Sequence, residues 1–165
     1  MDFADIYEKY SREIYRFALY LSGNRALAED LTAETFVNAF CGRAEIRVGT
    51  VKAYLIAITR NLYRDSIAFH RRLVPIDEVA EQVDPSPLPD RAAAQSRTFS
   101  RMLRAVRKLP EAQRDALILA VDHELGYEQI AAILGCSVAA VKVRIHRARL
   151  QLRLELMEEE PTWKT

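Results

Sequence analysis

The sequence predicts an all-α protein made of two small helical domains joined by a flexible linker. Apolar residues recur at intervals of three and four over long stretches, and 50% of the 165 residues are hydrophobic, which is enough for a core. Only five glycines interrupt these patterns, so little room is left for strands. Prolines and acidic residues gather between Val74 and Asp90 and separate the two helical blocks.

Composition and charge narrow the functions that this chain can have. The net charge of +1 excludes a uniformly basic nucleic-acid coat, so any affinity for DNA must come from local patches. The N-terminus carries no secretion signal and no apolar run could span a bilayer, which predicts a cytoplasmic protein without membrane insertion. The three histidines are scattered and form no pattern with a nucleophile, so neither catalysis nor a metal site nor a cofactor is expected.

The cysteines indicate structural roles. Cys41 and Cys136 lie far apart and match neither a CxxC motif nor a metal-ligand spacing. We expect both to be buried as small hydrophobic residues in a reducing compartment, and we disfavour a redox switch.

The first two helices are expected from Phe3 to Leu21 and from Arg25 to about Phe40. Ser22-Gly23-Asn24 ends the first helix, and the Asn24 side chain can cap the second. The second helix carries three acidic residues: Glu29, Asp30 and Glu34. Like charges one turn apart cost roughly 0.2–0.5 kcal/mol, which suggests a cation supplied by a partner. The simpler alternative is a solvated acidic face.

A third helix is expected to begin at Val51 and to run out through His70, Arg71 and Arg72. One side of it carries three polar residues: Arg60, Asn61 and Arg64. Three aromatic residues accompany them: Tyr54, Tyr63 and Phe69. Basic side chains beside exposed aromatic rings can hold single-stranded nucleic acid by charge and stacking. The alternative is that the tyrosines belong to the core and the arginines are solvated.

The second block begins with a helix from Ala93 to Lys108. Leu109-Pro110-Glu111 predicts a turn with Pro110 at the start of the next helix. The apolar face of that helix is expected to contain Leu117, Ile118, Ala120 and Val121.

The stretch from Tyr127 to Arg153 predicts a helix-turn-helix. Gly135 supplies the left-handed turn between its helices, and Ser137 can cap the second helix. Five apolar residues of the second helix form one inward stripe: Val138, Val141, Ile145, Ala148 and Leu152. The helix trails into glutamates as far as Glu158, and residues 159–165 are expected to be frayed.

Among the other positions of this last helix, five residues are cationic and His146 can become so, and no acidic residue lies between Ser137 and Arg153: Lys142, Arg144, Arg147, Arg149 and Arg153. Ala139 and Val143 point away from the inward stripe, together with His146 and Arg147, while Ala140 lies on one shoulder. Small residues let a helix approach the bases, arginine can bind guanine through two hydrogen bonds, and Val143 can contact a thymine methyl. We therefore favour DNA binding over a core helix with a solvated charged face.

Taken together, the two blocks resemble the bacterial sigma factors of extracytoplasmic function (ECF) type, within the sigma-70 family. Four stretches carry the resemblance in order: AEDLTAETF (28–36), AITRNL (57–62), LPE with QR (109–114), and YEQIA through VKVRIHRAR (127–149). The resemblance implies a region 2 domain over residues 1–72, a linker over 73–92, a region 4 domain over 93–158 and a tail over 159–165.

The resemblance also implies partners. The acidic helix with Glu29, Asp30 and Glu34 would dock on the clamp coiled coil of the RNA polymerase β′ subunit, which supplies the missing cations. Region 4 would contact the β flap. Members of the family are commonly held inactive by an anti-sigma factor. The implied function is promoter-specific transcription initiation without catalysis by this chain.

For promoter DNA, the resemblance implies two sites. The loop from Ala44 to Thr50 and the third helix would capture a flipped base of the melted minus-10 element, with Asn61 in the pocket and Arg60 and Arg64 on the backbone. The last helix would read the minus-35 duplex through the outward residues named above, Ala140 and Val143 included. Lys142, Arg144 and Arg147 would contact bases or phosphates, and Arg149 would clamp a phosphate.

The chain departs from the common family pattern at three places. Ala139-Ala140 replaces Gly-Thr, Val143 replaces serine, and Tyr54 replaces tryptophan. An apolar residue at the most outward position removes a hydrogen bond, so we expect upstream preference to rest on methyl contacts or DNA shape. The competing hypothesis is a self-sufficient helix-turn-helix regulator whose N-terminal block dimerises or senses a ligand. Such a regulator has no use for the acidic helix.

Overall fold

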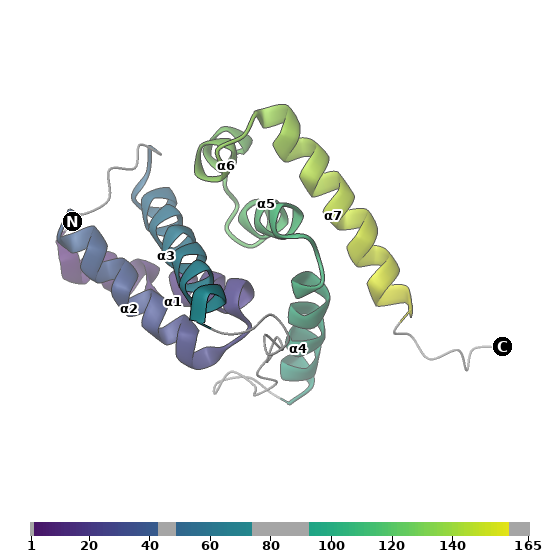
Figure 1. Ribbon diagram of the computed structural model, residues 1–165, viewed down its shortest axis with the longest axis horizontal. Coiled ribbons are helices and arrows are strands. Elements are labelled where there is room, and N and C mark those ends of the chain that lie inside the picture. The colour runs from purple at the N-terminus through teal and green to yellow at the C-terminus, as the bar shows by residue number, and fades with distance from the viewer. Residues whose placement is uncertain (1, 43–48, 74–92, 159–165) are drawn as a thin grey trace. The chain divides into compact units, whose positions relative to one another are not determined.

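The computed structural model describes residues 2–42, 49–73 and 93–158, and within these ranges every regular element is an α-helix (Figure 1). This confirms the predicted all-α class. The chain divides into two compact units, Met1–Asp84 and Pro85–Thr165. The predicted linker lies outside the described residues except for Leu73, which is the last residue of a helix. Of the predicted capturing loop, only Gly49 and Thr50 are described.

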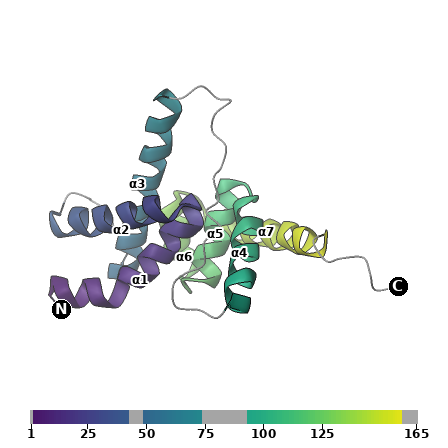
Figure 2. The same ribbon diagram turned by 90° about the horizontal axis from the view of Figure 1, so that it is seen from below.

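The first unit is a bundle of α1 (Phe3–Ser22), α2 (Arg25–Phe40) and α3 (Val51–Leu73), each of which packs on the other two. Its core is made of large apolar side chains from all three helices, among them Ile14, Phe17, Leu21, Leu31, Phe36, Leu55 and Ile58. Figure 2 shows the C-terminal half of α3 running beyond α1 and α2. The side chains of that half, from Ala68 to Leu73, are accordingly exposed.

Local side-chain caps set the ends of these helices. The Asp2 carboxylate accepts a hydrogen bond from the Asp5 amide at 2.9 Å, which starts α1. Gly23 ends α1 in the left-handed region, at φ 62°. The Asn24 side chain then accepts from the Leu27 amide at 3.0 Å, so the predicted cap of α2 is confirmed.

The second unit contains α4 (Ala93–Arg107), α5 (Glu111–Val121), α6 (Tyr127–Leu134) and α7 (Val138–Glu158). Pro110 is the N-cap of α5, as predicted. A buried ion pair joins Arg114 Nε to Asp115 Oδ1 at 3.1 Å. The core includes Leu103, Val106, Leu119, Ile130, Val141, Ile145 and Ala148.

The helix-turn-helix formed by α6 and α7 is confirmed in its details. Gly135 has a φ of 64° and ends α6, while the Ser137 hydroxyl oxygen accepts from the Ala140 amide at 3.1 Å and caps α7. The two helix axes are bent by 95°. Val141, Ile145 and Ala148 are buried and Val138 and Leu152 are half-buried, so the predicted inward stripe is correct.

Two expectations about side-chain burial in these helices were wrong, and one alternative that the sequence left open is settled. Cys41 is exposed and Cys136 is half-buried, because both lie in turns after helix ends and not on a core face. In α5, Leu119 is buried and Val121 is 58% exposed, so the apolar face is shifted from the predicted one. Tyr63 is only 6% exposed, which settles it as a core residue and not a stacking platform.

No single helix in the described ranges is long and apolar enough to cross a membrane. The bent pair of α6 and α7 passes that test on length and composition alone.

Candidate nucleic-acid interface

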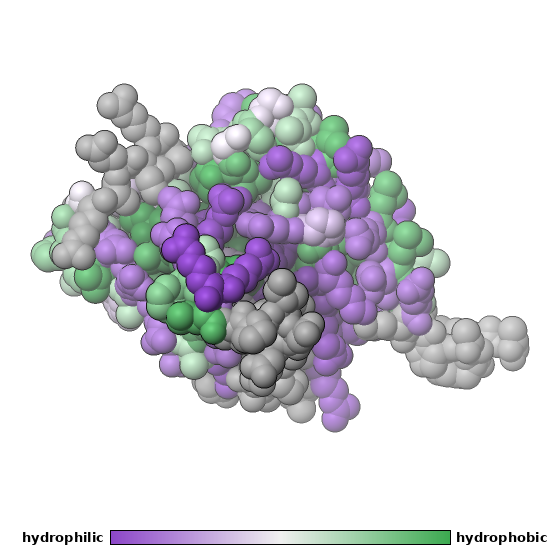
Figure 3. Space-filling view, in the orientation of Figure 1, coloured by the Kyte–Doolittle hydropathy of each residue, from purple (hydrophilic) through white to green (hydrophobic). Residues whose placement is uncertain are grey.

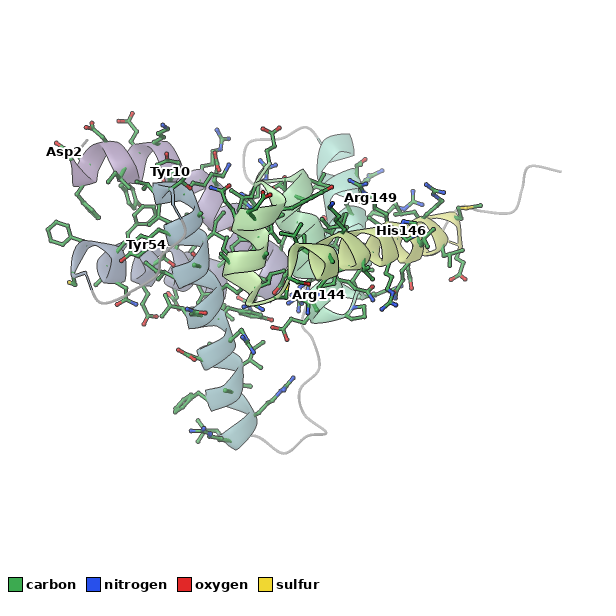
Figure 4. The ribbon with its side chains drawn as sticks, turned by 90° about the horizontal axis from the view of Figure 1, so that it is seen from above. Asp2, Tyr10, Tyr54, Arg144, His146 and Arg149 are labelled. Carbon is green, nitrogen blue, oxygen red and sulfur yellow. The ribbon has the colours of Figure 1, made fainter. Side chains whose placement is uncertain are left out.

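The cationic side of α7 is arranged as the sequence predicted. Lys142, His146, Arg147 and Arg149 are exposed, and the outward Val143 is 46% exposed. Ala140 and Arg144 are half-buried on one shoulder. Figure 4 shows Arg144 and Arg149 toward opposite sides of the helix. The acidic residues of α7 begin at Glu155, whose carboxylate binds Nζ of Lys108, the residue after α4, at 2.9 Å. The first four turns of α7 therefore keep their positive charge.

Two of these cations contact side chains from outside α7. Arg144 Nη1 donates to Cys136 Sγ at 3.3 Å. Cys136 lies in the turn between α6 and α7, directly before the capping residue Ser137. Lys142 Nζ lies 5.9 Å from the centroid of the Tyr127 ring, at the start of α6. Sequence reasoning missed both supports. They arise from the bend between α6 and α7, which helical periodicity does not encode.

Asn61 and Arg64 lie together on the exposed side of α3. With Asp65 and Ala68 they line an open hollow of about 410 Å³. Arg60 differs from the prediction, because its side chain is only 8% exposed. The reason is that α1 and α2 pack on α3 from two sides, so every residue from Leu55 to Arg60 is buried. Arg60 is therefore not a surface cation, and of the predicted trio Asn61 and Arg64 remain as exposed candidates.

An aromatic cluster at one end of the first unit was also missed. The rings of Phe3 and Phe40 have centroids 4.9 Å apart, and so do those of Tyr7 and Phe36. The adjoining hollow of about 350 Å³ is lined by these phenylalanines and by Val51 and Tyr54, among others. Phe40 and Val51 are the helix ends that flank residues 41–50. The exposed ring of Phe40 and the exposed Val51 side chain therefore lie at the helix ends on either side of residues 41–50.

The acidic residues of α2 form a separate surface. Glu29, Asp30 and Glu34 are exposed, and within the part of the chain that the structure describes none of them forms an ion pair. The opposite side of α2 buries Leu31, Thr35 and Phe36 against the bundle. The three carboxylates thus face outward as a patch without an ion-pair partner in the described part of the chain, and we call this patch the acidic surface.

In the second unit an open apolar groove lies between α4 and the C-terminal half of α7. It encloses about 560 Å³, with Met102, Leu152 and Met157 among its lining and Arg101, Arg149 and Arg153 as its cations. Arg101 Nη2 also donates to the Leu156 carbonyl at 2.8 Å and ties the two helices together. Figure 3 shows hydrophobic residues scattered between hydrophilic ones on the visible side of α7.

Among the described residues, no three His, Cys, Asp or Glu side chains are placed to bind a metal ion.

Family models match both units. Residues 6–73 match the model described as Sigma-70 region 2, and residues 99–152 match the model described as Sigma-70, region 4. Each unit therefore matches the model of one sigma-70 region.

Comparison with individual relatives shows which kind of sigma factor this chain resembles. The chain is 37% identical over 137 residues to the ECF RNA polymerase sigma factor EcfG of Rhodopseudomonas palustris, covering 82% of this chain and 75% of the relative. It is 35% identical over 153 residues to the ECF RNA polymerase sigma factor SigE of Mycolicibacterium smegmatis. That match covers 90% of this chain but only 59% of the relative. The chain belongs to the ECF family of RNA polymerase sigma factors.

A solved structure agrees with this assignment. The sigma factor RpoE from Bartonella quintana, crystallised in complex with the anti-sigma factor NepR, is 29% identical to this chain and superposes with a TM-score of 0.82. The match covers 96% of this chain and 98% of RpoE.

Proposed function

We propose that this chain binds core RNA polymerase and directs it to promoters, has no catalytic activity of its own and is controlled by an anti-sigma factor in the cytoplasm. One observation carries the proposal beyond family membership. An acidic surface with no ion-pair partner among the described residues and an exposed polar hollow share one three-helix unit, while a helix that carries no acidic residue before Glu155 and presents cations on its outward side occupies the other unit. A polymerase adaptor needs these three surfaces, and an independent regulator needs only the last.

The acidic surface is our candidate for the polymerase contact. Glu29, Asp30 and Glu34 repel one another along α2, and a basic partner such as the β′ clamp coiled coil would remove that repulsion. The groove between α4 and α7 is our candidate for the β flap, because an apolar floor with arginines at its edge suits an amphipathic helix.

The hollow on α3 is our candidate for the melted minus-10 strand. The Asn61 amide can both donate to and accept from a base edge, and Arg64 beside it can neutralise a phosphate. The aromatic cluster around Phe40 adds rings on which unstacked bases can lie. Capturing an unpaired base offsets the cost of unstacking it, so DNA opening needs no ATP hydrolysis by this chain.

The cationic helix α7 is our candidate for the minus-35 duplex. Ala139 and Ala140 at its start permit close approach to the bases, and the exposed cations that follow can reach both bases and phosphates. We assign region 2 to residues 1–72 and region 4 to 93–158, with 73–92 as linker and 159–165 as tail. Control by an anti-sigma factor is supported by the likeness to RpoE, which was crystallised with NepR.

Binding to core polymerase tests the proposal directly. The full chain, fluorescently labelled, is titrated with core RNA polymerase, and Asp30→Lys is compared with Glu8→Lys. Both residues are exposed, lie within helices of the first unit and form no ion pair with a described residue. Both variants replace an acidic residue with lysine, so they change the net charge equally. We expect Asp30→Lys to weaken binding at least tenfold, corresponding to about 1.4 kcal/mol, and Glu8→Lys to leave it near the wild-type value.

Two results would count against the proposal. Equal weakening by both variants would mean that the acidic surface acts only through net charge. Undetectable binding of the wild-type chain to core polymerase would leave the cationic helix as the sole functional surface, as in an independent regulator.

A further inference from the structure

We propose that Cys136 and Tyr127 are positioning residues for DNA recognition, which hold Arg144 and Lys142 so that these two cations read bases while the later arginines follow phosphates. The inference rests on the proposed minus-35 reading by α7 and assigns separate tasks within that surface.

The support for Arg144 comes from the turn itself. The Cys136 amide donates to the Ala131 carbonyl at 3.1 Å, and the Gly135 amide bonds to the same carbonyl, so hydrogen bonds fix the backbone that carries the sulfur. The sulfur in turn accepts from Arg144 Nη1 at 3.3 Å, two turns farther along α7. A sulfur acceptor is weak, but both side chains are half-buried, which limits the competition from water. The guanidinium is thereby tied back toward the start of α7.

The support for Lys142 comes from α6. Tyr127 is the first residue of that helix, and its ring lies under the Lys142 ammonium at 5.9 Å from the centroid, within the range of a cation–π contact. Lys142 and Arg144 are two positions apart, so they leave α7 on opposite flanks and bracket Val143, the outward residue between them. The start of the helix therefore presents an apolar contact with one held cation on each side.

The later cations differ. His146, Arg147 and Arg149 are exposed and form no hydrogen bond, ion pair or ring contact with any described residue. A side chain held before binding loses less conformational entropy when it meets one particular base, whereas an unheld arginine can settle on whichever phosphate is near. This contrast assigns base discrimination to the held pair and general affinity to the unheld arginines.

The test uses the full chain and duplexes selected by the wild-type protein from a randomised pool. Four variants form two matched pairs: Cys136→Ala with Cys136→Ser, and Tyr127→Leu with Tyr127→Phe. Serine keeps an acceptor and phenylalanine keeps a ring, so each pair separates loss of the support from change of the residue. The measurements are the ratio of affinities for the selected duplex and its single base-pair variants, and the slope of log affinity against log salt concentration.

We expect Cys136→Ala and Tyr127→Leu each to lower the discrimination ratio about twofold to fivefold without changing the salt slope, and the serine and phenylalanine variants to restore it. Arg149→Ala should do the opposite, reducing the slope by about one and sparing discrimination. Unchanged discrimination in Cys136→Ala and Tyr127→Leu, with folded helices by circular dichroism, would overturn the inference. If the wild-type protein selects no duplex at all, it is the proposed minus-35 reading that fails.

Discussion

The hydroxyl oxygens of Thr35 and Thr59 lie 3.0 Å apart across the buried interface between α2 and α3. Each oxygen also lies within hydrogen-bond distance of a carbonyl of its own helix, at 2.6 Å from Leu31 and 2.8 Å from Leu55. Thr35 directly follows Glu34 of the acidic surface, and Thr59 precedes Asn61 by two residues. The contact therefore joins the helix proposed to bind polymerase to the helix proposed to bind the melted strand.

Removing either hydroxyl should destabilise the first unit. Thr59→Val keeps the shape of the side chain but leaves Thr35 without its cross-helix partner, so we expect the free energy of opening to fall by about 1 kcal/mol. Hydrogen exchange of the α2 and α3 amides measures this for the first unit alone. The double variant with Thr35→Val should cost less than the sum of the single changes, since both remove the same contact. Strictly additive costs would show that the hydroxyls do not interact.

The turn of the helix-turn-helix should depend on glycine at position 135. Its φ of 64° is strained for residues with a Cβ, although a Cβ there would meet no atom within 4 Å. Gly135→Ala should therefore lower stability by about 1–2 kcal/mol through backbone strain alone. Gly135→Asn should cost less, because asparagine tolerates the left-handed region. Thermal unfolding of the two variants checks the order, and equal losses would point away from backbone conformation.

Asn61 should matter for single-stranded DNA and not for duplex DNA. We expect Asn61→Ala to weaken binding of the polymerase complex to a single-stranded downstream element and to leave binding to the upstream duplex unchanged. The reason is that Asn61 lines the hollow on α3, in the other unit from α7, which is the helix proposed to read the duplex. Electrophoretic mobility shifts with both probes measure this. An unchanged affinity for the single strand would remove Asn61 from the base pocket.

Arg147 tests the division of contacts along α7. Arg147→Ala should cost about 1–3 kcal/mol at one base position if the side chain reads a base edge. If Lys142 and Arg144 read the bases, the loss should instead be nearly equal on all sequences, because Arg147 is held by no contact with a described residue. Affinities for the selected duplex and its base-pair variants distinguish the two results. Arg147→Lys keeps the charge and should retain most of the affinity if only phosphates are contacted.

The helices and their ends could be predicted from the sequence because the signals are local. Asn24, Pro110, Gly135 and Ser137 act on backbone groups within a few residues, so the structure begins and ends helices where these residues indicate. The outward side of α7 was predictable for the same reason, since one periodicity sets the buried stripe and the cationic face together.

The rest depends on packing between helices. Arg60 was expected on the polar side of the third helix, and Tyr63 was left open between an exposed ring and a core residue. Both are buried, because α3 is covered by two helices and not one. The Cys136–Arg144 and Tyr127–Lys142 contacts bridge α7 and its surroundings across a bend of 95°, a geometry that the sequence pattern does not contain.

Run-off transcription with core RNA polymerase and a promoter library, with and without this chain, tests the proposed promoter-directing function. We predict specific transcripts that require the chain, that disappear when Glu29, Asp30 and Glu34 are all changed to lysine, and that persist with Glu8→Lys. The start sites of those transcripts would also identify the promoter. If no transcript depended on the chain while the chain alone still bound duplex DNA tightly, it would be an independent regulator and not a sigma factor.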